Sequence, residues 1–288
     1  MRQISVSQFT TCHWTFEEDL LRYQALGYDS IGIWRRKIDD FGHRDAIDML
    51  YDSSLGVSSL NWAGGFTGSD CRSFIDAVDD AMDAISLASK LKADTLIVHP
   101  GARNNHTNSH AFRLLESALM QLTPVAEDYG VKLSIELIPG FVESPWTFVH
   151  SFSQVDQLLD SFAPDQLGLV LDLYHAGLNQ PAMDRLEQFA DRISLVQLSD
   201  RIDGTSADES RLLPGQGNVD IAQWITKLDH MGYNGPIELE VHGAGVEGVD
   251  YFDRLDLSYD YLRRELPARP VQPAARQTLP TAELRLPE

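Results

Sequence analysis

The hydrophobic residues of the chain gather in eight short runs, separated by longer amphipathic stretches. The runs lie at residues 3–9, 30–34, 57–63, 95–101, 132–139, 167–175, 193–200 and 236–243. Short apolar runs bounded by turn residues are typical of strands buried in a parallel sheet. The stretches between them show helical periodicity, most clearly at 15–27, 73–91, 111–130 and 220–232. Several of them end in Gly, the usual helix stop, and Thr15 followed by Glu18 resembles a capping box.

Strand–helix alternation along the whole chain predicts a parallel sheet covered by helices. Eight repeats, with no sequence left for a second domain, predict an α/β protein built as one (β/α)₈ TIM barrel over residues 1–266. A doubly wound open sheet is the alternative, but the Gly-rich phosphate loop expected there is missing. Residues 267–288 hold several prolines and no periodicity. They predict an extended or disordered C-terminal tail.

Polar residues occur late in several of the apolar runs. They are His99, Glu136, Asp172, Gln197, Glu238, Glu240 and His242. In a parallel barrel the carboxyl ends of the strands form the rim that holds the active site. Four consecutive strands would therefore bring carboxylate or amide oxygens to one end of the barrel.

Three carboxylates crowded at one rim repel one another, and a divalent cation relieves that repulsion better than protonation at neutral pH. We predict Glu136, Asp172, Gln197 and Glu240 as its ligands. Glu240 is preferred to Glu238 because it lies nearer the rim. Oxygen ligands suit Mn²⁺ or Mg²⁺, with Co²⁺ and Zn²⁺ as alternatives.

Each of these residues also has a purely structural interpretation. Asp172 at a strand end can cap a helix, Glu238 can pair with a basic side chain inside the barrel, and His99 can be a hydrogen-bonded core histidine. Trp34 and Trp62, at the ends of the second and third strands, form either a platform for a sugar-like ligand or a cap on the barrel.

Charge and cysteine content narrow the class of partner. The chain has 23 basic and 43 acidic residues, for a net charge of −20. So acidic a surface repels nucleic acid and anionic membranes. The two cysteines, Cys12 and Cys71, make neither a metal cluster nor a disulfide framework. No apolar run approaches the roughly 18 residues of a membrane span, and no signal-peptide core is present. We expect a cytoplasmic protein with a small-molecule substrate, with homo-oligomerisation left open.

Five segments together resemble a known superfamily. "LSIELIP", "LGLVLDLYHAG", "ISLVQLSDR", "LPGQGNVD" and "GYNGPIELEVHG" are similar to segments of the xylose-isomerase-like sugar phosphate isomerase/epimerase superfamily, over about residues 1–265. The Asp-x-x-His at 172–175 and the Pro-Gly-x-Gly at 214–217 are the most specific parts. The resemblance implies a (β/α)₈ barrel with one divalent metal. Carried over, its ligands fall on Glu136, Asp172, position 197 and Glu240.

The resemblance also implies roles in catalysis. Glu136 and Glu240 would act as base and acid on opposite sides of the substrate, with His242 as an alternative acid. His175 would be a further catalytic residue in contact with the substrate. Arg201 and His242 would also contact the substrate, and His99 would hold a substrate oxygen.

One position departs from the epimerase pattern. Position 197 is Gln where the sugar epimerases commonly have His. Gln occurs there in some relatives that dehydrate cyclic ketones, and its neutral oxygen can still bind a metal.

The predicted activity is a metal-dependent isomerisation or epimerisation in carbohydrate metabolism. It would act on a keto-sugar or cyclitol through a metal-stabilised enediolate. One alternative is a lyase of the 3-dehydroshikimate or inosose dehydratase type. Another is a sugar-binding barrel without catalytic activity.

Overall fold

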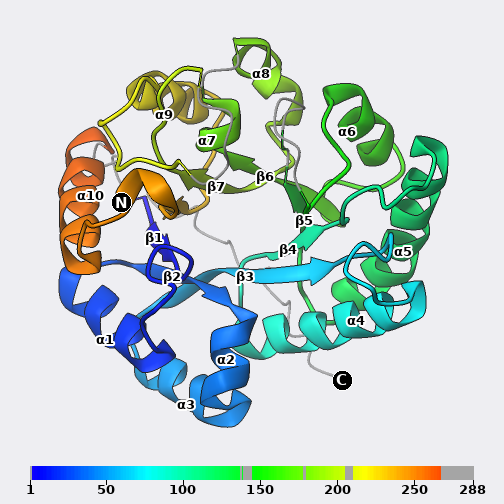
Figure 1. Cartoon of the computed structure of the whole chain (residues 1–288), viewed down its shortest axis with the longest axis horizontal. Coiled ribbons are helices and arrows are strands. Elements are labelled where there is room, and N and C mark those ends of the chain that lie inside the picture. The colour runs from blue at the N-terminus through cyan, green and yellow to red at the C-terminus, as the bar shows by residue number, and fades with distance from the viewer. Residues whose placement is uncertain (1, 137, 139–144, 178–179, 205–209, 267–288) are drawn as a thin grey trace, which may run out of the picture.

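Eight parallel strands form a closed barrel in the order of the chain, β1 to β8 (Figure 1). The computed structural model describes residues 2–136, 138, 145–177, 180–204 and 210–266. The strands are β1 Ile4–Ser7, β2 Ser30–Trp34, β3 Gly56–Gly64, β4 Leu96–His99, β5 Leu133–Glu136, β6 Leu167–Asp172, β7 Ile193–Leu198 and β8 Ile237–Leu239. Each predicted apolar run overlaps one of them, and β3 extends one residue beyond its run at each end. The predicted barrel is therefore confirmed. The predicted tail at 267–288 lies outside the described residues.

Helices surround the barrel on its outer side (Figure 1). They are α1 Phe16–Leu26, α2 Arg35–Phe41, α3 His43–Asp52, α4 Phe74–Leu91, α5 Asn108–Asp128, α6 Phe152–Leu159, α7 Leu173–Ala176, α8 Gln180–Arg185, α9 Ile221–His230 and α10 Tyr251–Glu265, with short 3₁₀ turns η1 Leu186–Phe189 and η2 Ala244–Val246. The capping box predicted for α1 is confirmed, since Thr15 and Glu18 each accept a hydrogen bond from the other's backbone N–H. Gly27 ends α1 with φ at 88°, a conformation that glycine adopts without strain. Within the described residues, no helix is long and apolar enough to cross a membrane.

The sixth strand is shorter than its apolar run. It ends at Asp172, whereas the sequence predicted an extended strand to residue 175. Residues 173–176 turn into α7 because the Asp172 carboxylate accepts a hydrogen bond from the Tyr174 N–H, at 2.8 Å, and caps the helix. The structural interpretation of Asp172 as a helix cap is therefore confirmed. One of its two oxygens is left to face the barrel mouth.

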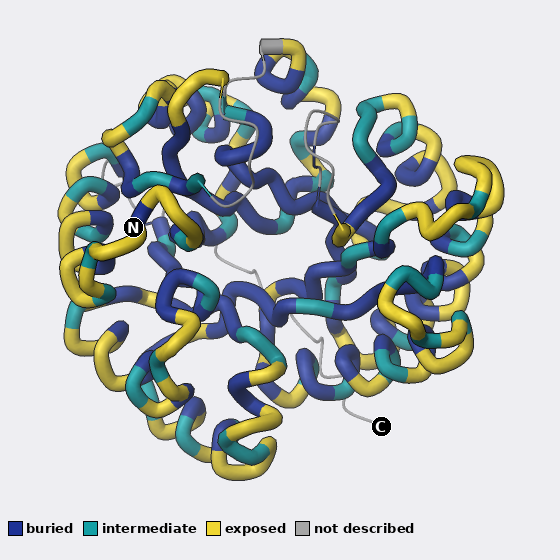
Figure 2. The backbone as a smooth tube through the Cα atoms, viewed as in Figure 1, coloured by how far each residue is buried: buried dark blue, intermediate teal, exposed yellow. Residues whose placement is uncertain are grey.

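The buried side chains form two apolar regions. One lies between the strands and the surrounding helices, where the tube in Figure 2 is dark blue on its inner side and yellow on the outer turns. The other is a small cluster of Ile97, Val170 and Leu195, from three different strands. Because side chains alternate along a strand, residues two positions further on share their face. Those residues are His99, Asp172 and Gln197. The inside of the barrel thus changes from apolar to polar in one step toward the rim.

Candidate functional site

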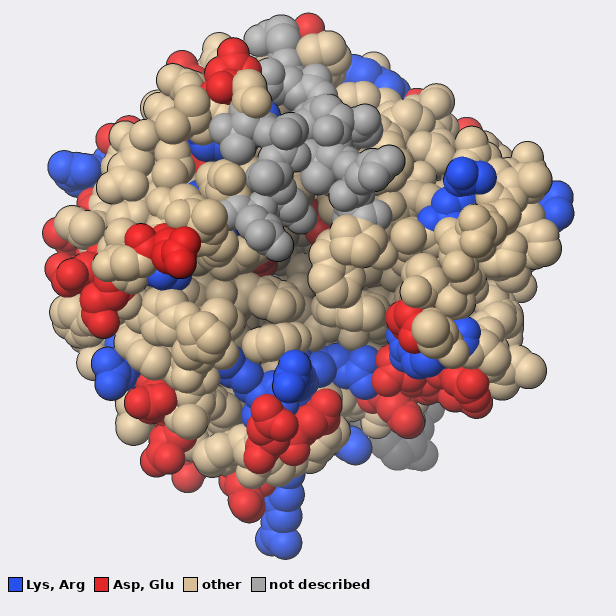
Figure 3. Space-filling view, in the orientation of Figure 1, with Lys and Arg blue, Asp and Glu red and all other residues tan. Residues whose placement is uncertain are grey.

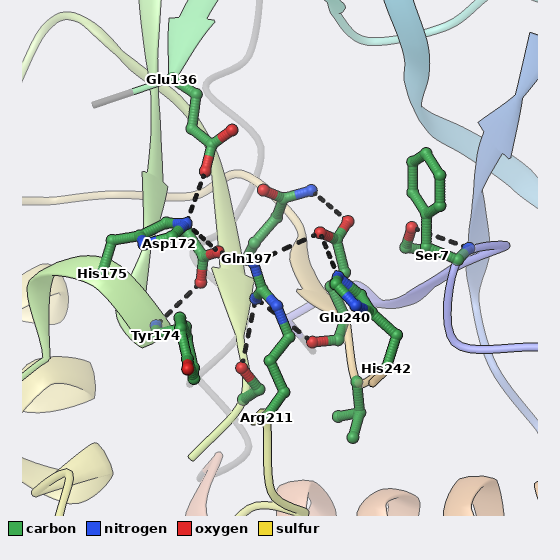
Figure 4. A network of polar contacts seen from close by, with 12 residues as sticks. Ser7, Glu136, Asp172, Tyr174, His175, Gln197, Arg211, Glu240 and His242 are labelled. Carbon is green, nitrogen blue, oxygen red and sulfur yellow. Dashed lines mark hydrogen bonds and ion pairs between the residues drawn. The ribbon is translucent and has the colours of Figure 1, made fainter. Parts of the chain in front are cut away.

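Three acidic or imidazole groups meet at the rim end of the barrel. Glu136, Asp172 and His175 each offer one atom, and these atoms lie within 4.8 Å of one another. His175 Nε2 is 3.4 Å from Glu136 Oε1 and 3.6 Å from Asp172 Oδ2. Figure 4 shows Glu136, Asp172 and His175 pointing toward one another. His99 Nδ1, on the neighbouring strand β4, is 3.7 Å from Glu136 Oε2. All three members of the cluster are buried, so this arrangement of two carboxylates and an imidazole could hold a divalent metal.

Gln197 and Glu240 extend this cluster on its other side. Gln197 Nε2 donates hydrogen bonds to Glu240 Oε2, at 2.7 Å, and to Glu238 Oε1, at 3.1 Å. In Figure 4, Glu136 and Glu240 lie on opposite sides of the site, and Asp172 and Gln197 lie between them. The four residues predicted as ligands are therefore neighbours. His175, predicted as a catalytic residue in contact with the substrate and not as a ligand, lies among the atoms of the first cluster.

Arg211 is a member of the site that sequence reasoning missed. Its Nη2 lies 2.7 Å from Asp172 Oδ2 and 3.7 Å from Glu240 Oε1. The guanidinium is almost fully buried and lies over the ring of Tyr174, 4.7 Å from its centroid. The only signal in the sequence is the position of an arginine three residues before the Pro-Gly-x-Gly segment. Arg211 balances part of the negative charge that the three carboxylates bring together.

Asp200 explains how Arg211 reaches the site. The Asp200 carboxylate accepts hydrogen bonds from the backbone N–H groups of Gly215, Gly217 and Val219, at 2.8 to 3.0 Å. The backbone of Asp200 also pairs with that of Leu212 in an isolated antiparallel bridge. A buried carboxylate that accepts several backbone N–H groups fixes the loop around it. This loop carries Arg211 back over the barrel mouth.

Electrostatics keep two of the carboxyls ionised. Burial raises the pKa of Asp172, but the charges of Arg211 and His175 outweigh it, and the pKa lies below its ordinary value. Burial likewise raises the pKa of Glu240, and His242 and Arg211 reverse that effect and lower it. Both groups are therefore carboxylates at neutral pH, the form that binds cations and accepts protons.

Glu238 has a different environment from Glu240. It is fully buried, and it accepts hydrogen bonds from Ser58, Ser59 and Gln197. Among the described residues its partners are thus hydroxyls and an amide, and the alternative expectation of a basic partner is wrong. Burial and the nearby charge of Glu240 raise the pKa of Glu238 to about 7. Glu240 follows the end of β8, so it lies nearer the rim, as the sequence predicted.

Aromatic side chains line the barrel mouth around the polar groups. Trp34 packs on Phe9, with ring centroids 4.9 Å apart. Trp62 makes an edge contact with His99 at 5.7 Å. In the face shown in Figure 3, the molecule is hollowed near its centre. Aromatic walls around a polar floor are typical of sites that bind small polyhydroxy molecules.

The remaining predicted substrate contacts lie at different depths. His242 is partly exposed, and its Nε2 is 3.8 Å from Glu240 Oε1. Arg201 is buried, its Nη1 donates to the backbone oxygen of Tyr174 at 3.1 Å, and it lies over the Tyr174 ring. These contacts support the turn that carries His175.

Comparison with known proteins agrees with this architecture. The model of the xylose isomerase-like TIM barrel family matches residues 20–264. The chain belongs to this family. The resemblance found in the sequence is therefore confirmed.

Several curated proteins that are similar to this chain are named as enzymes. An inosose isomerase from Halalkalibacterium halodurans is 31% identical over 235 residues, covering 78% of this chain and 82% of the relative. A 3-dehydroshikimate dehydratase from Pseudomonas aeruginosa is 24% identical over 239 residues, which cover 80% of this chain and 37% of that longer protein.

Solved structures share the fold. The IolI protein, whose structure was determined with a zinc atom, superposes with a TM-score of 0.79 at 20% identity, covering 92% of this chain and 98% of the other. An L-ribulose 3-epimerase superposes with a TM-score of 0.75 at 18% identity, covering 92% of this chain and 95% of the other.

Proposed function

We propose that this protein is a divalent-metal-dependent isomerase or epimerase of polyhydroxy ketones, either cyclitol ketones of the inosose type or keto-sugars. The observation that carries the proposal is the convergence of three buried carboxylates at the ends of separate strands, around His175 and Gln197 at the rim. They are Glu136, Asp172 and Glu240. The 31% identity to an inosose isomerase supports the cyclitol ketone as substrate class.

The donor atoms at the rim fit a divalent cation. Glu136, Asp172, Gln197 and Glu240 would hold it, and His175 lies close enough to join them. The oxygen atoms favour Mn²⁺ or Mg²⁺, whereas a ligating His175 would favour Zn²⁺ or Co²⁺. When bound, the metal supplies Lewis-acid stabilisation of the negative charge that develops on the ketone oxygen.

The two glutamates on opposite sides of the site would move the protons. Glu240 is ionised, so it can remove a proton from the carbon next to the ketone. Glu136, held near His99 and His175, would start in its protonated form and give that proton to the other face, which inverts the carbon and leaves Glu240 protonated and Glu136 ionised. Return of the proton to the neighbouring carbon isomerises the substrate instead. His242, 3.8 Å from Glu240 at the rim, would hold a substrate oxygen.

Solvent deuterium incorporation tests the reaction class. We expect Mn²⁺-dependent exchange, detected by NMR, at the carbon next to the carbonyl of an inosose or ketose. Glu240→Gln should abolish the exchange while circular dichroism and thermal unfolding stay close to those of the wild type. Substantial exchange in Glu240→Gln would remove this residue from the reaction. Absence of exchange across a panel of ketoses and cyclitols would favour the sugar-binding barrel without activity.

A dehydratase is the second candidate. Gln at position 197 and the 24% identity to a 3-dehydroshikimate dehydratase favour it. After the same proton abstraction, loss of a β-hydroxyl would produce a conjugated enone. A rise in ultraviolet absorbance on incubation with 3-dehydroshikimate or inosose would support the lyase, and exchange without that rise would support the isomerase.

A further inference from the structure

The Gln197 amide presents a choice that a carboxylate does not have. One end of the amide is an oxygen, which can bind a cation, and the other end is an NH₂ group, which cannot. Whether position 197 serves as a ligand therefore depends on which end faces the site. A half-turn rotation of the amide would replace the oxygen that faces the site, a possible metal ligand, with the NH₂ group, a hydrogen-bond donor.

Both hydrogens of the amide already have acceptors. Nε2 lies 2.7 Å from Glu240 Oε2 and 3.1 Å from Glu238 Oε1. In these contacts Glu240 Oε2 and Glu238 Oε1 both act as acceptors, so a rotated amide would set its oxygen against two other oxygens. Figure 4 shows the amide oxygen on the side that faces Glu136 and Asp172. The carboxyl groups thus select the orientation in which Oε1 faces the cluster.

Of the two acceptors, Glu238 is the one whose carboxyl is held by hydrogen bonds from inside the barrel. Its other oxygen, Oε2, accepts from Ser58 Oγ at 2.7 Å and from Ser59 Oγ at 2.9 Å. Gly32 leaves room for this carboxyl, because a Cβ there would lie 2.4 Å from Oε2. Glu238 therefore has a fixed place in the barrel interior. Glu240, by contrast, stands at the rim and is itself a proposed ligand.

We infer that Glu238 is a positioning residue, which holds the Gln197 amide so that its oxygen faces the metal site. Glu238 makes position 197 an oxygen ligand without being a ligand itself. The inference rests on the proposed function, in which Gln197 binds the metal. It assigns a role to a residue that the proposed reaction does not otherwise use.

Two substitutions separate the hydrogen bond from the charge. Glu238→Met keeps a side chain of similar length but removes the acceptor, and partners of this kind typically contribute about 10- to 100-fold to metal affinity. We expect isothermal titration calorimetry to show an Mn²⁺ affinity of Glu238→Met that is lower than that of the wild type by this factor. Glu238→Gln removes the charge but keeps an oxygen for Gln197, with its NH₂ turned to the serines. It should restore affinity to within about threefold of the wild type, because the acceptor decides the orientation.

A double-mutant cycle shows whether Glu238 acts through Gln197. In a Gln197→Ala background, Glu238→Met should cause no further loss of Mn²⁺ affinity. The visible absorption spectrum of the Co²⁺-loaded protein should change in Glu238→Met and should stay as in the wild type in Glu238→Gln. In the Gln197→Ala background, substitution of Glu238 should not change that spectrum. A further loss of affinity in the Gln197→Ala background would overturn the inference. So would wild-type affinity in Glu238→Met.

Failure of the proposed function gives a different result. If the wild type binds no Mn²⁺ or Co²⁺, or if Gln197→Ala binds them as the wild type does, the proposed ligand set is wrong and the role of Glu238 falls with it. If Gln197→Ala loses affinity and Glu238→Met does not, only the role of Glu238 is wrong. Should Glu238→Met not fold, the Ser58→Ala, Ser59→Ala double variant loosens the same carboxyl. The double variant should weaken Mn²⁺ binding when residue 197 is Gln, and it should have no effect in the Gln197→Ala background. Unchanged binding when residue 197 is Gln would count against the inference.

Discussion

Arg211 shows how single residues balance charge at this site. Asp172 is fully buried, and its nearest cation is the Arg211 guanidinium at 2.7 Å. A buried carboxylate without a partner is costly, and breaking such a pair typically costs about 3–5 kcal/mol. Arg211 therefore stabilises the protein in the absence of a metal as well as shaping the site.

Substitution of Arg211 should destabilise the metal-free protein. We expect Arg211→Met to lower the free energy of unfolding by about 3 kcal/mol, because Asp172 loses its counter-charge. Saturating Mn²⁺ should reduce the difference in free energy of unfolding between the wild type and Arg211→Met, because the cation would then neutralise the Asp172 carboxylate. Urea unfolding followed by fluorescence, with and without Mn²⁺, measures both values. Arg211→Lys keeps the charge and is the control. An equal loss with and without Mn²⁺ would show that Asp172 does not meet the metal.

At this scale the sequence predicts residues on strands better than residues on loops. Alternation along a strand and position near its end placed Glu136, Asp172, Gln197 and Glu240 at the rim from the sequence alone. Arg211 could not be placed in that way. Its position depends on the backbone hydrogen bonds that the Asp200 carboxylate accepts, and no periodicity encodes them.

Among the elements, strand β2 supports the site through a missing side chain. A Cβ at Gly32 would lie 2.4 Å from Glu238 Oε2 and 2.8 Å from Ser59 Oγ. We expect Gly32→Ala to destabilise the protein by about 1–3 kcal/mol, as overpacking does, and to weaken Mn²⁺ binding by displacing the Glu238 carboxyl. Gly56→Ala is the matched control, because its Cβ would meet the end of the flexible Gln3 side chain. Thermal unfolding and calorimetry compare the two, and equal Mn²⁺ affinities in them would contradict this account.

Helices α2 and α4 are joined by a carboxylate between two arginines. Asp80 Oδ1 is 2.8 Å from Arg35 Nη2, and Asp80 Oδ2 is 2.9 Å from Arg72 Nη1. Burial raises the pKa of Asp80, but hydrogen bonds and charges from Arg35 and Arg72 lower it below 3.8. Because the folded state favours the ionised form, this stabilisation is present above pH 3.8 and is lost as the pH falls through the lowered pKa.

The contribution of Asp80 can be read from the pH dependence of stability. Asp80→Asn should lower the unfolding temperature at pH 7, and its unfolding temperature should fall less steeply than that of the wild type below about pH 4. Asp83→Asn, at an exposed position of the same helix, is the control and should behave as the wild type at both pH values. Parallel wild-type and Asp80→Asn curves from pH 7 to pH 3 would contradict the assignment.

The elements themselves were largely predictable, and their ends were not. The runs at 30–34 and 193–200 contain β2 and β7 because apolar residues continue through the strand. The run at 167–175 was too long by three residues, since the apolar Leu173 and Tyr174 suit a buried helix turn as well as a strand. The hydrogen bond from the Tyr174 N–H to Asp172 decides between the two.

At the scale of the whole molecule, net charge opposes folding. A chain with a net charge of −20 repels itself, and salt screens that repulsion. Raising NaCl from about 0.01 to about 0.1 M shortens the screening length from about 30 to about 10 Å. We expect the unfolding temperature, measured by calorimetry, to rise over this range. Tetramethylammonium chloride at equal ionic strength should give the same rise. A rise with NaCl alone would indicate specific cation binding.

The carboxylate of Asp172 connects the candidate metal site at the barrel mouth to the backbone of helix α7. One oxygen holds the Tyr174 N–H and the other points toward the cluster, on a single rigid plane. A cation that pulls on the second oxygen must tilt that plane and strain or tighten the first contact. The amide signal of Tyr174 in a heteronuclear NMR spectrum should therefore shift when a cation occupies the site, and the shift can be measured without any substrate.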